Sequence, residues 1–172
     1  DQHYNNINDS DDNSSTMWQF GDDNVAYNWQ DGDWNNSTVE QVGFRNDAYV
    51  EQHGNHHTAT AIEGSIWWGS RDGEVDQYQY GHGNTAFANH EEDFNRIWQE
   101  QHGNGNYAES YQNTWTFGDS NLTRQYQHGH GNIAYARQEN FINGTGGVDG
   151  DGNDILQEQH GRENLANAYQ DG

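Results

Sequence analysis

The sequence predicts an all-β fold, a two-sheet β-solenoid of the strand–arc–strand type with about 22 residues per turn and cross-β stacking of its turns. Three observations predict this fold. An 11-residue frame, Q-x-G-x-x-N-x-A-x-x-x-Q, recurs along the chain. The fixed residues in the second half of the frame fall at steps of two, which is the side-chain period of a β-strand. Glycine interrupts most of the units and no apolar stripe of helical period is sustained, so helices are not expected.

The repeat frame is clearest between Gln101 and Gln112, where the closing Gln can also open the next unit. Other copies run over residues 19–30, 41–52, 79–90, 127–138 and 159–170, and the copy at 79–90 closes on His instead of Gln. Self-similarity at a short fixed period is the mark of a repeat architecture. Two units of 11 residues therefore make one turn, and successive turns are expected to stack about 4.8 Å apart.

The chain divides into a short leading segment and one long repeat region. Residues 1–7 fit the frame poorly and are expected to be poorly ordered or to serve in export, whereas residues 8–172 form one solenoid of about 13 half-turns. Excursions at 64–72, 113–120 and 139–152 interrupt the frame, which resumes after each of them. Insertions that restore the frame afterwards are typical of loops on a solenoid.

The alternating residues of each unit predict which face of a strand points inward. Asn106, Ala108, Ser110 and Gln112 share one face, and this face is composed of small and amide side chains. Stacked turns place Asn over Asn and Gln over Gln, so the amides are expected to form hydrogen-bonded ladders while Ala lets the two sheets approach closely. The predicted structural ladder comprises Gln19, Asn24, Ala26, Gln30, Asn35, Gln41, Asn46, Ala48, Gln52, Gln79, Asn84, Ala86, Asn95, Gln101, Asn106, Ala108, Gln112, Asn121, Gln127, Asn132, Ala134, Gln138, Asn153, Gln159, Asn164, Ala166 and Gln170.

Glycine and the aromatic residues define the arcs and the outer face. G-x-x-N supplies a tight turn, because Gly adopts a positive φ readily and Asn tolerates one. The predicted turn glycines are Gly21, Gly32, Gly43, Gly54, Gly81, Gly103, Gly129 and Gly161. Outward positions carry Trp29, Tyr49, Phe87, Trp98 and Tyr135, which are expected to form axial aromatic ladders or lateral contacts between fibres. In the alternative register, shifted by one residue, these aromatics form the core and the amides lie outside.

The strongest copies of the motif change sides along the coil. Those that open at Gln19 and Gln41 fall on odd half-turns, whereas those that open at Gln79, Gln101 and later fall on even half-turns. The change takes place within residues 52–78.

The composition excludes several functional classes. Only 30% of the residues are hydrophobic and the net charge is −22, which alone would suggest disorder, but aromatics reach 13% and the polar excess is periodic. All six basic residues are Arg and they are scattered, so nucleic-acid binding is not expected. No apolar run is long enough for membrane insertion. Cys is absent and no leader is visible at the start, so the chain is interpreted as mature after cleavage or as cytosolic.

Neither a metal ion nor another cofactor is predicted. His53, His102, His128 and His160 all follow the Gln that opens a unit, so they occupy one repeat position on an arc that is expected to be solvated. One weak alternative is a Ca²⁺ loop at Asp149, Asp151 and Asn153. That segment lacks the Gly and the Glu that such a loop needs at its sixth and twelfth positions, and a flexible Gly-Asp loop is preferred.

No catalytic site is predicted either. The sequence has no arrangement of nucleophile and base, no phosphate-binding loop and no carboxylate pair that stands out from the repeat. The enzymes that use a parallel β-helix are longer and have aliphatic cores. The chain is therefore not expected to be an enzyme.

Two segments carry a resemblance to a known family. Gln79-Tyr-Gly81-His-Gly83-Asn84-Thr-Ala86 and the matching segment at 127–134 resemble the curlin repeat of the curli amyloid subunit, S/N-x5-Q-x-G-x-G-N-x-A-x3-Q. The resemblance covers about residues 8–170, and five units match the full Q-G-N-A-Q frame. The chain departs from the family pattern in its acidity, its abundant Trp and its long excursions.

The resemblance implies a secreted structural subunit that self-assembles into curli-like functional amyloid fibres of an extracellular biofilm matrix. The implied partners are further copies of the chain, a nucleator and the outer-membrane export channel of a curli-type system. The implied location is extracellular, at the cell surface or in the matrix. A regular unit at 159–170 with no cap favours head-to-tail stacking, because an unpaired strand edge can pair with another molecule.

Two other classes of protein remain open. A soluble β-solenoid adhesin or glycan-binding protein would use the outward aromatics. An ice-binding solenoid would need a flat, regular Thr array, whereas the outward positions here vary between Tyr27, Thr38, Tyr49 and Thr60.

Overall fold

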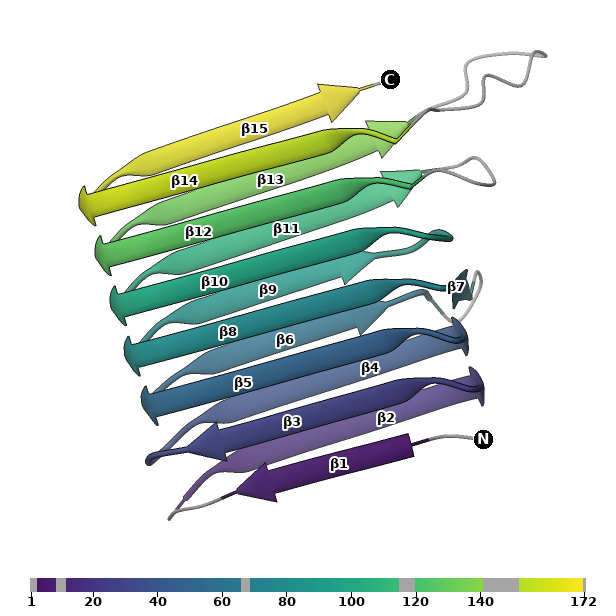
Figure 1. Ribbon diagram of the computed structural model, residues 1–172, viewed down its shortest axis with the longest axis horizontal. Coiled ribbons are helices and arrows are strands. Elements are labelled where there is room, and N and C mark those ends of the chain that lie inside the picture. The colour runs from purple at the N-terminus through teal and green to yellow at the C-terminus, as the bar shows by residue number, and fades with distance from the viewer. Residues whose placement is uncertain (1–2, 9–11, 66–68, 115–119, 141–151, 172) are drawn as a thin grey trace.

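A computed structural model describes residues 3–8, 12–65, 69–114, 120–140 and 152–171. These residues form two stacked parallel sheets and no helix, so the predicted all-β solenoid is confirmed (Figure 1). The first sheet contains, in spatial order, β1 (His3–Asn8), β3 (Val25–Asp31), β5 (Asp47–Asn55), β8 (Glu74–His82), β10 (Arg96–Asn104), β12 (Leu122–His130) and β14 (Asp154–Arg162). The second sheet contains β2 (Ser14–Asp22), β4 (Asn36–Phe44), β6 (Thr58–Glu63), β9 (Thr85–His90), β11 (Tyr107–Thr114), β13 (Ile133–Asn140) and β15 (Leu165–Asp171). The two-residue strand β7 (Ser70–Arg71) pairs with β4.

Every turn of the coil keeps the register of the turn before it. Gln101 pairs with Gln79 on one side and with Gln127 on the other, and Gly103 pairs in the same way with Gly81 and Gly129. The pairing partners are 22 residues apart where no excursion intervenes and further apart where one does. The excursions therefore lengthen the connections without shifting the repeat positions.

The leading segment takes part in the coil. The sequence predicts residues 1–7 to lie outside the solenoid, whereas the structure places His3–Asn8 in β1, paired in parallel with β3. Backbone pairing needs no side-chain motif, so a segment with a poor match to the frame can still form the edge strand of the stack.

The interior between the sheets is narrow and mixed in character. Small apolar side chains such as Ala48, Ala59 and Ala61 are fully buried beside buried Gln and Asn. Among the described residues, Ile97 is the largest apolar side chain that is fully buried. The aromatics lie on the outer faces, so the register in which the amides point inward is the one observed.

The two edges of the coil are built differently. Arcs from the first sheet to the second carry Gly32, Gly54, Gly81, Gly103, Gly129 and Gly161, all with positive φ, and we call this edge the glycine edge. A Cβ added to Gly103 would lie 2.0 Å from the carbonyl oxygen of Gly129, so no other residue fits this stack. The opposite edge, which we call the loop edge, carries Gly21 and Gly43 only in its first turns.

The difference between the two edges explains why the strongest copies of the repeat motif lie on the loop edge in the first turns and on the glycine edge in the later turns. After Gly43 the glycine column of the loop edge continues with Ser70 of β7. In the sequence, all three excursions come after second-sheet strands, namely β6, β11 and β13, so each is inserted into a connection from the second sheet back to the first. Once one edge is used for insertions, only the glycine edge keeps the tight Q-x-G-x-x-N arc. Most of the excursions at 113–120 and 139–152 lies outside the described residues.

Candidate assembly ladders and end surfaces

The Gln side chains of the first sheet form a continuous ladder along the coil. Each Nε2 donates to the Oε1 of the next turn at 2.8 to 2.9 Å, in the order Gln30, Gln52, Gln79, Gln101, Gln127, Gln159. The second hydrogen of each amide goes to a backbone carbonyl of the opposite sheet, as from Gln101 Nε2 to Thr85 O at 2.9 Å. One amide thus links two turns and both sheets, which leaves no donor of the amide unpaired in a dry interior.

The Asn side chains join the arcs of successive turns. Asn106 Oδ1 accepts the backbone N–H of Asn132 at 3.0 Å, and Asn106 Nδ2 donates to the carbonyl of Gly129 at 3.2 Å. Asn84 makes the equivalent bonds to Asn106 and Gly103. These bonds satisfy backbone groups that the arc would otherwise leave unpaired.

His57 replaces Asn in one of these positions and reproduces its hydrogen bonding. Its Nδ1 accepts the backbone N–H of Asn84 at 3.2 Å, and its Nε2 lies 3.1 Å from the carbonyl of His53. Burial lowers the pKa of His57, so the neutral ring with one donor and one acceptor is favoured. A neutral imidazole is therefore an adequate substitute for the amide.

The structure places all predicted ladder residues at inward positions. They are buried in the middle of the stack and half-buried in the last turn, at Asn153, Asn164, Ala166 and Gln170. The eight predicted turn glycines all have positive φ. Asp149 and Asp151, two of the three residues of the alternative Ca²⁺ loop, lie outside the described residues. The backbone N–H of the third, Asn153, donates a hydrogen bond to Asn121 Oδ1.

The first sheet also contains a second Gln ladder, which the 11-residue frame does not predict. Gln77, Gln99, Gln125 and Gln157 connect in that order at 2.8 to 2.9 Å, two residues before the first ladder. The signal was present as Q-x-Q, which recurs at 77–79, 99–101, 125–127 and 157–159. The C-terminal half of the coil therefore has two parallel amide ladders in its first sheet.

In one column of the second sheet, two turns carry an ionisable side chain in place of Gln. Gln41 Nε2 donates to Glu63 Oε2 at 2.6 Å, and Glu63 Oε1 lies 3.4 Å from His90 Nε2. The ionisable side chains of Glu63 and His90 are both fully buried. His90 fits because Gly73 faces it, since a Cβ on Gly73 would lie 2.2 Å from the imidazole Cε1.

The outer face of the first sheet carries stacked rings. Tyr27 stacks on Tyr49 with ring centres 4.6 Å apart, and Tyr78 lies 5.0 Å from Trp98. A second column stacks Tyr80 between His53 and His102 at 5.1 and 4.7 Å. Burial of the phenol, followed by the charge of nearby carboxylates, raises the pKa of Tyr78 to about 12, so this ring stays neutral.

Asp76 lies in the same face with an altered proton affinity. Burial, followed by the charge and hydrogen bond of Glu74, raises the pKa of Asp76 to about 7, while Arg96 opposes this effect. The guanidinium of Arg96 forms an ion pair with Glu74 at 2.5 Å. Its positive charge therefore offsets the raised pKa of Asp76 only in part.

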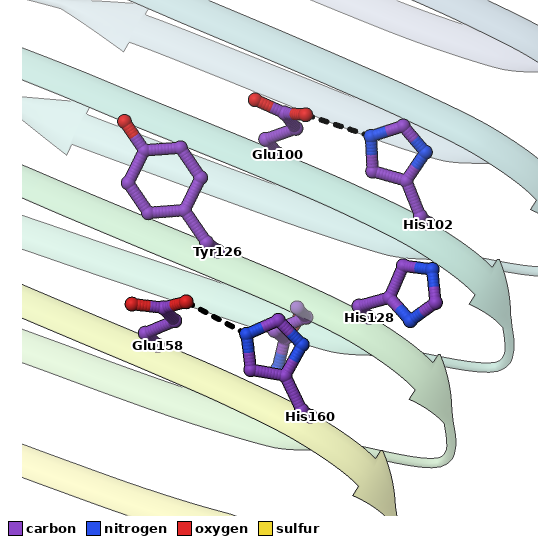
Figure 2. A pocket seen from close by; sticks show the side chains of 7 residues that line it. Glu100, His102, Tyr126, His128, Glu158 and His160 are labelled. Carbon is purple, nitrogen blue, oxygen red and sulfur yellow. Dashed lines mark hydrogen bonds and ion pairs between the residues drawn. The ribbon is translucent and has the colours of Figure 1, made fainter.

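Further along the same face, the groove in Figure 2 lies over the last three strands of the first sheet. Its volume is about 540 Å³, and it is lined by Glu100, His102, Tyr126, Gln127, His128, Glu158 and His160. Glu100 bonds to His102 and Glu158 bonds to His160, each pair at 2.7 Å.

The two ends of the stack present strand edges. Among the described residues, β1 and β2 at one end and β14 and β15 at the other each pair on one side only. By repeat position, Met17 begins the column that ends at Ala168, and Gln19 begins the column that ends at Gln170. The two ends therefore present the same series of repeat positions.

Fold and ladders together define a cross-β solenoid stabilised by stacked amides. A family model described as the curlin associated repeat matches residues 29–54 and 38–61, which span β4 and β5 and include parts of β3 and β6. The chain thus contains the curlin associated repeat, in agreement with the predicted resemblance. No curated protein and no solved structure gave a match. Within the described residues, no helix is long and apolar enough to cross a membrane.

Proposed function

We propose that this chain is a structural subunit that stacks head to tail into curli-type amyloid fibres outside the cell. The curlin repeat connects the chain to curli-type amyloid subunits, which are structural proteins. In this proposal the chain is exported, meets a nucleator and contributes to a biofilm matrix. Its role is structural and not enzymatic.

The match between the two ends of the coil carries the proposal. A second copy placed beyond β15 would set its Met17 over Ala168 and its Gln19 over Gln170, one strand spacing away. Gln170 Nε2 already donates to Asp154 O at 3.1 Å, as the inner Gln residues do to their own opposite strands. A contact between unlike ends does not close on itself and continues into a fibre.

Two end-blocking variants test the direction of stacking. Met17→Arg places a charge at the inward position of the first second-sheet strand, and Ala168→Arg does so on the last. Each variant alone is expected to stay monomeric, whereas an equimolar mixture forms a 1:1 dimer through the two intact ends. Light scattering with size-exclusion chromatography measures this, and Thr16→Arg and Asn167→Arg, which face outward on the same strands, serve as controls that still form fibres.

Other outcomes would overturn the proposal. Dimers of a single variant would indicate contacts between like ends, and fibres from both variants would indicate a different interface. A wild-type chain that stays monomeric at every concentration would favour the second candidate, a soluble glycan-binding solenoid. That candidate is favoured by one observation, the stacked rings of Tyr27 and Tyr49 on the outer face.

A further inference from the structure

Three imidazoles lie in one column on the outer face of the first sheet. His102, His128 and His160 occupy equivalent positions on β10, β12 and β14 and pair in register. Their ring centres are 6.1 Å apart between the first two and 6.0 Å apart between the last two (Figure 2). The excursions before β12 and β14 do not disturb this alignment. The sequence shows a repeat position, but only the stacked structure makes the three rings neighbours.

The ring separation suits two imidazoles that share one metal ion. Two imidazoles that bind one Zn²⁺ at the usual Zn–N distance of about 2 Å have ring centres about 5 to 6 Å apart. Two neighbouring turns of this column therefore need only a small rotation of their rings to meet a common ion. The described residues contain no group of three or more His, Cys, Asp or Glu placed to hold an ion together, so an ion here would bind two imidazoles and complete its coordination with water.

The flanking carboxylates fix the outer two rings for such a role. His102 Nε2 lies 2.7 Å from Glu100 Oε1, and His160 Nε2 lies 2.7 Å from Glu158 Oε1. A carboxylate that accepts the proton of one ring nitrogen leaves the lone pair on the other nitrogen, and metal-binding His residues are commonly held in this way. The Nδ1 atoms of His102 and His160 are thereby available as ligands.

The central ring can serve either neighbour. Position 126, which would hold the orienting carboxylate of His128, is Tyr. The carbonyl of His128 accepts a hydrogen bond from Asn132 Nδ2, but among the described residues its imidazole has only ring contacts, with His102 and His160. The ring is exposed and borders the open groove, so an ion can reach it. A neutral imidazole has one lone pair, so His128 binds with His102 or with His160 but not with both at once.

We propose that His102, His128 and His160 form a divalent transition-metal site on the outer face of the first sheet, with His128 as the shared ligand and one ion per chain. Imidazole nitrogen favours ions such as Zn²⁺ over Ca²⁺ or Mg²⁺, which prefer oxygen. The net charge of −22 raises the local concentration of cations. The bound ion connects two neighbouring turns and thereby stabilises the C-terminal half of the coil.

Isothermal titration calorimetry of the full chain with Zn²⁺ tests the site. Wild type is expected to bind one Zn²⁺ per chain with a saturable isotherm, and His128→Gln is expected to weaken binding at least about tenfold, since both pairs are lost. His53→Gln is the matched control. His53 has its own carboxylate, Glu51, but its neighbours in the column are Asp31 and Tyr80, so this variant is expected to bind Zn²⁺ as wild type does.

Equal affinity of wild type and His128→Gln would overturn the proposal, as would a non-saturating isotherm of wild type. An equal loss in His53→Gln would also overturn it, because the binding would then be general to exposed His. Long-range ¹H–¹⁵N spectra of the imidazoles give a second readout. Zn²⁺ is expected to shift the Nδ1 resonances of His102 and His160 while their Nε2 atoms stay protonated, and spectra in which no imidazole responds would contradict the assignment.

Discussion

Glu63 and His90 meet in the interior of the coil, with Glu63 Oε1 3.4 Å from His90 Nε2 and both side chains fully buried. Glu63 Oε1, both nitrogens of His90 and the Oε1 of Gln112 have no hydrogen-bonding partner among the described residues. The amide ladder of the second sheet is therefore interrupted at two successive turns. It is continuous from Gln19 to Gln41 before them and from Gln112 to Gln170 after them.

Restoring the amides at this interruption is expected to stabilise the fold. The double variant Glu63→Gln/His90→Gln gives each buried acceptor a donor, and each unsatisfied buried polar group costs about 1–3 kcal/mol. We expect the free energy of unfolding to rise by about 2 kcal/mol, measured in guanidinium chloride. His90→Gln alone should destabilise the fold, because the buried Glu63 carboxyl then loses the imidazole that lies 3.4 Å from it. Glu40→Gln, on the outer face of β4, is the control and should change little.

Replacing the Asn ladder tests the interior from the opposite direction. Asn106→Leu/Asn132→Leu removes the acceptors for the backbone N–H groups of Asn132 and Asn164, together with the donors to Gly129 and Gly161. We expect a loss of at least about 3 kcal/mol and much slower fibre growth, because several buried backbone groups become unpaired. Tyr107→Leu, outward on β11, serves as the control. Unchanged denaturant resistance and growth rate would show that the inward amides do not stabilise the coil.

The pH dependence of stability is expected to reflect Asp76. Its pKa is raised from 3.8 to about 7, so the native state holds this proton more tightly than the unfolded chain does. The stabilising contribution is therefore complete below pH 3.8 and is lost as the pH rises to about 7. Unfolding midpoints between pH 4 and pH 7.5 should fall for wild type and fall less for Asp76→Asn. Partial exposure keeps the slope well below the limit of about 1.4 kcal/mol per pH unit.

A steeper fall in Asp76→Asn than in wild type would contradict this assignment. Asp33→Asn removes one exposed carboxylate and is the control for the change in net charge. Its midpoints should follow those of wild type across the same range.

The period of 11 predicted the fold class because the steps of two within each unit define both the strand and its inward face. The same steps of two predict inward positions for Asn106 and Gln101, and both side chains are buried in the structure. The 11-residue frame does not include Gln77, because the second Gln of each Q-x-Q pair already satisfies the frame. The contact between Glu63 and His90 could not be predicted from the sequence either. The excursion at 64–72 lies between the two residues, and the sequence does not show which turns become neighbours across it.

Charge at the junction between copies is expected to control the rate of assembly. Asp12 and Glu163 both occupy the positive-φ position that precedes the Asn of an arc on the glycine edge. Head-to-tail stacking would place Glu163 of one copy next to Asp12 of the following copy, two like charges about one strand spacing apart. The net charge of −22 adds a long-range repulsion that salt screens, with a Debye length of about 30 Å at 0.01 M and about 8 Å at 0.15 M.

Glu163→Gln should therefore accelerate fibre growth at low salt and weaken its dependence on NaCl, as followed by thioflavin fluorescence from 0.01 to 0.15 M salt. Glu109→Gln removes the same charge from β11 in the middle of the stack, away from either end, and should give a smaller effect. Equal acceleration by both variants would mean that only the net charge matters and that Glu163 is not at the junction. Growth that slows as salt is added would contradict the role of repulsion altogether.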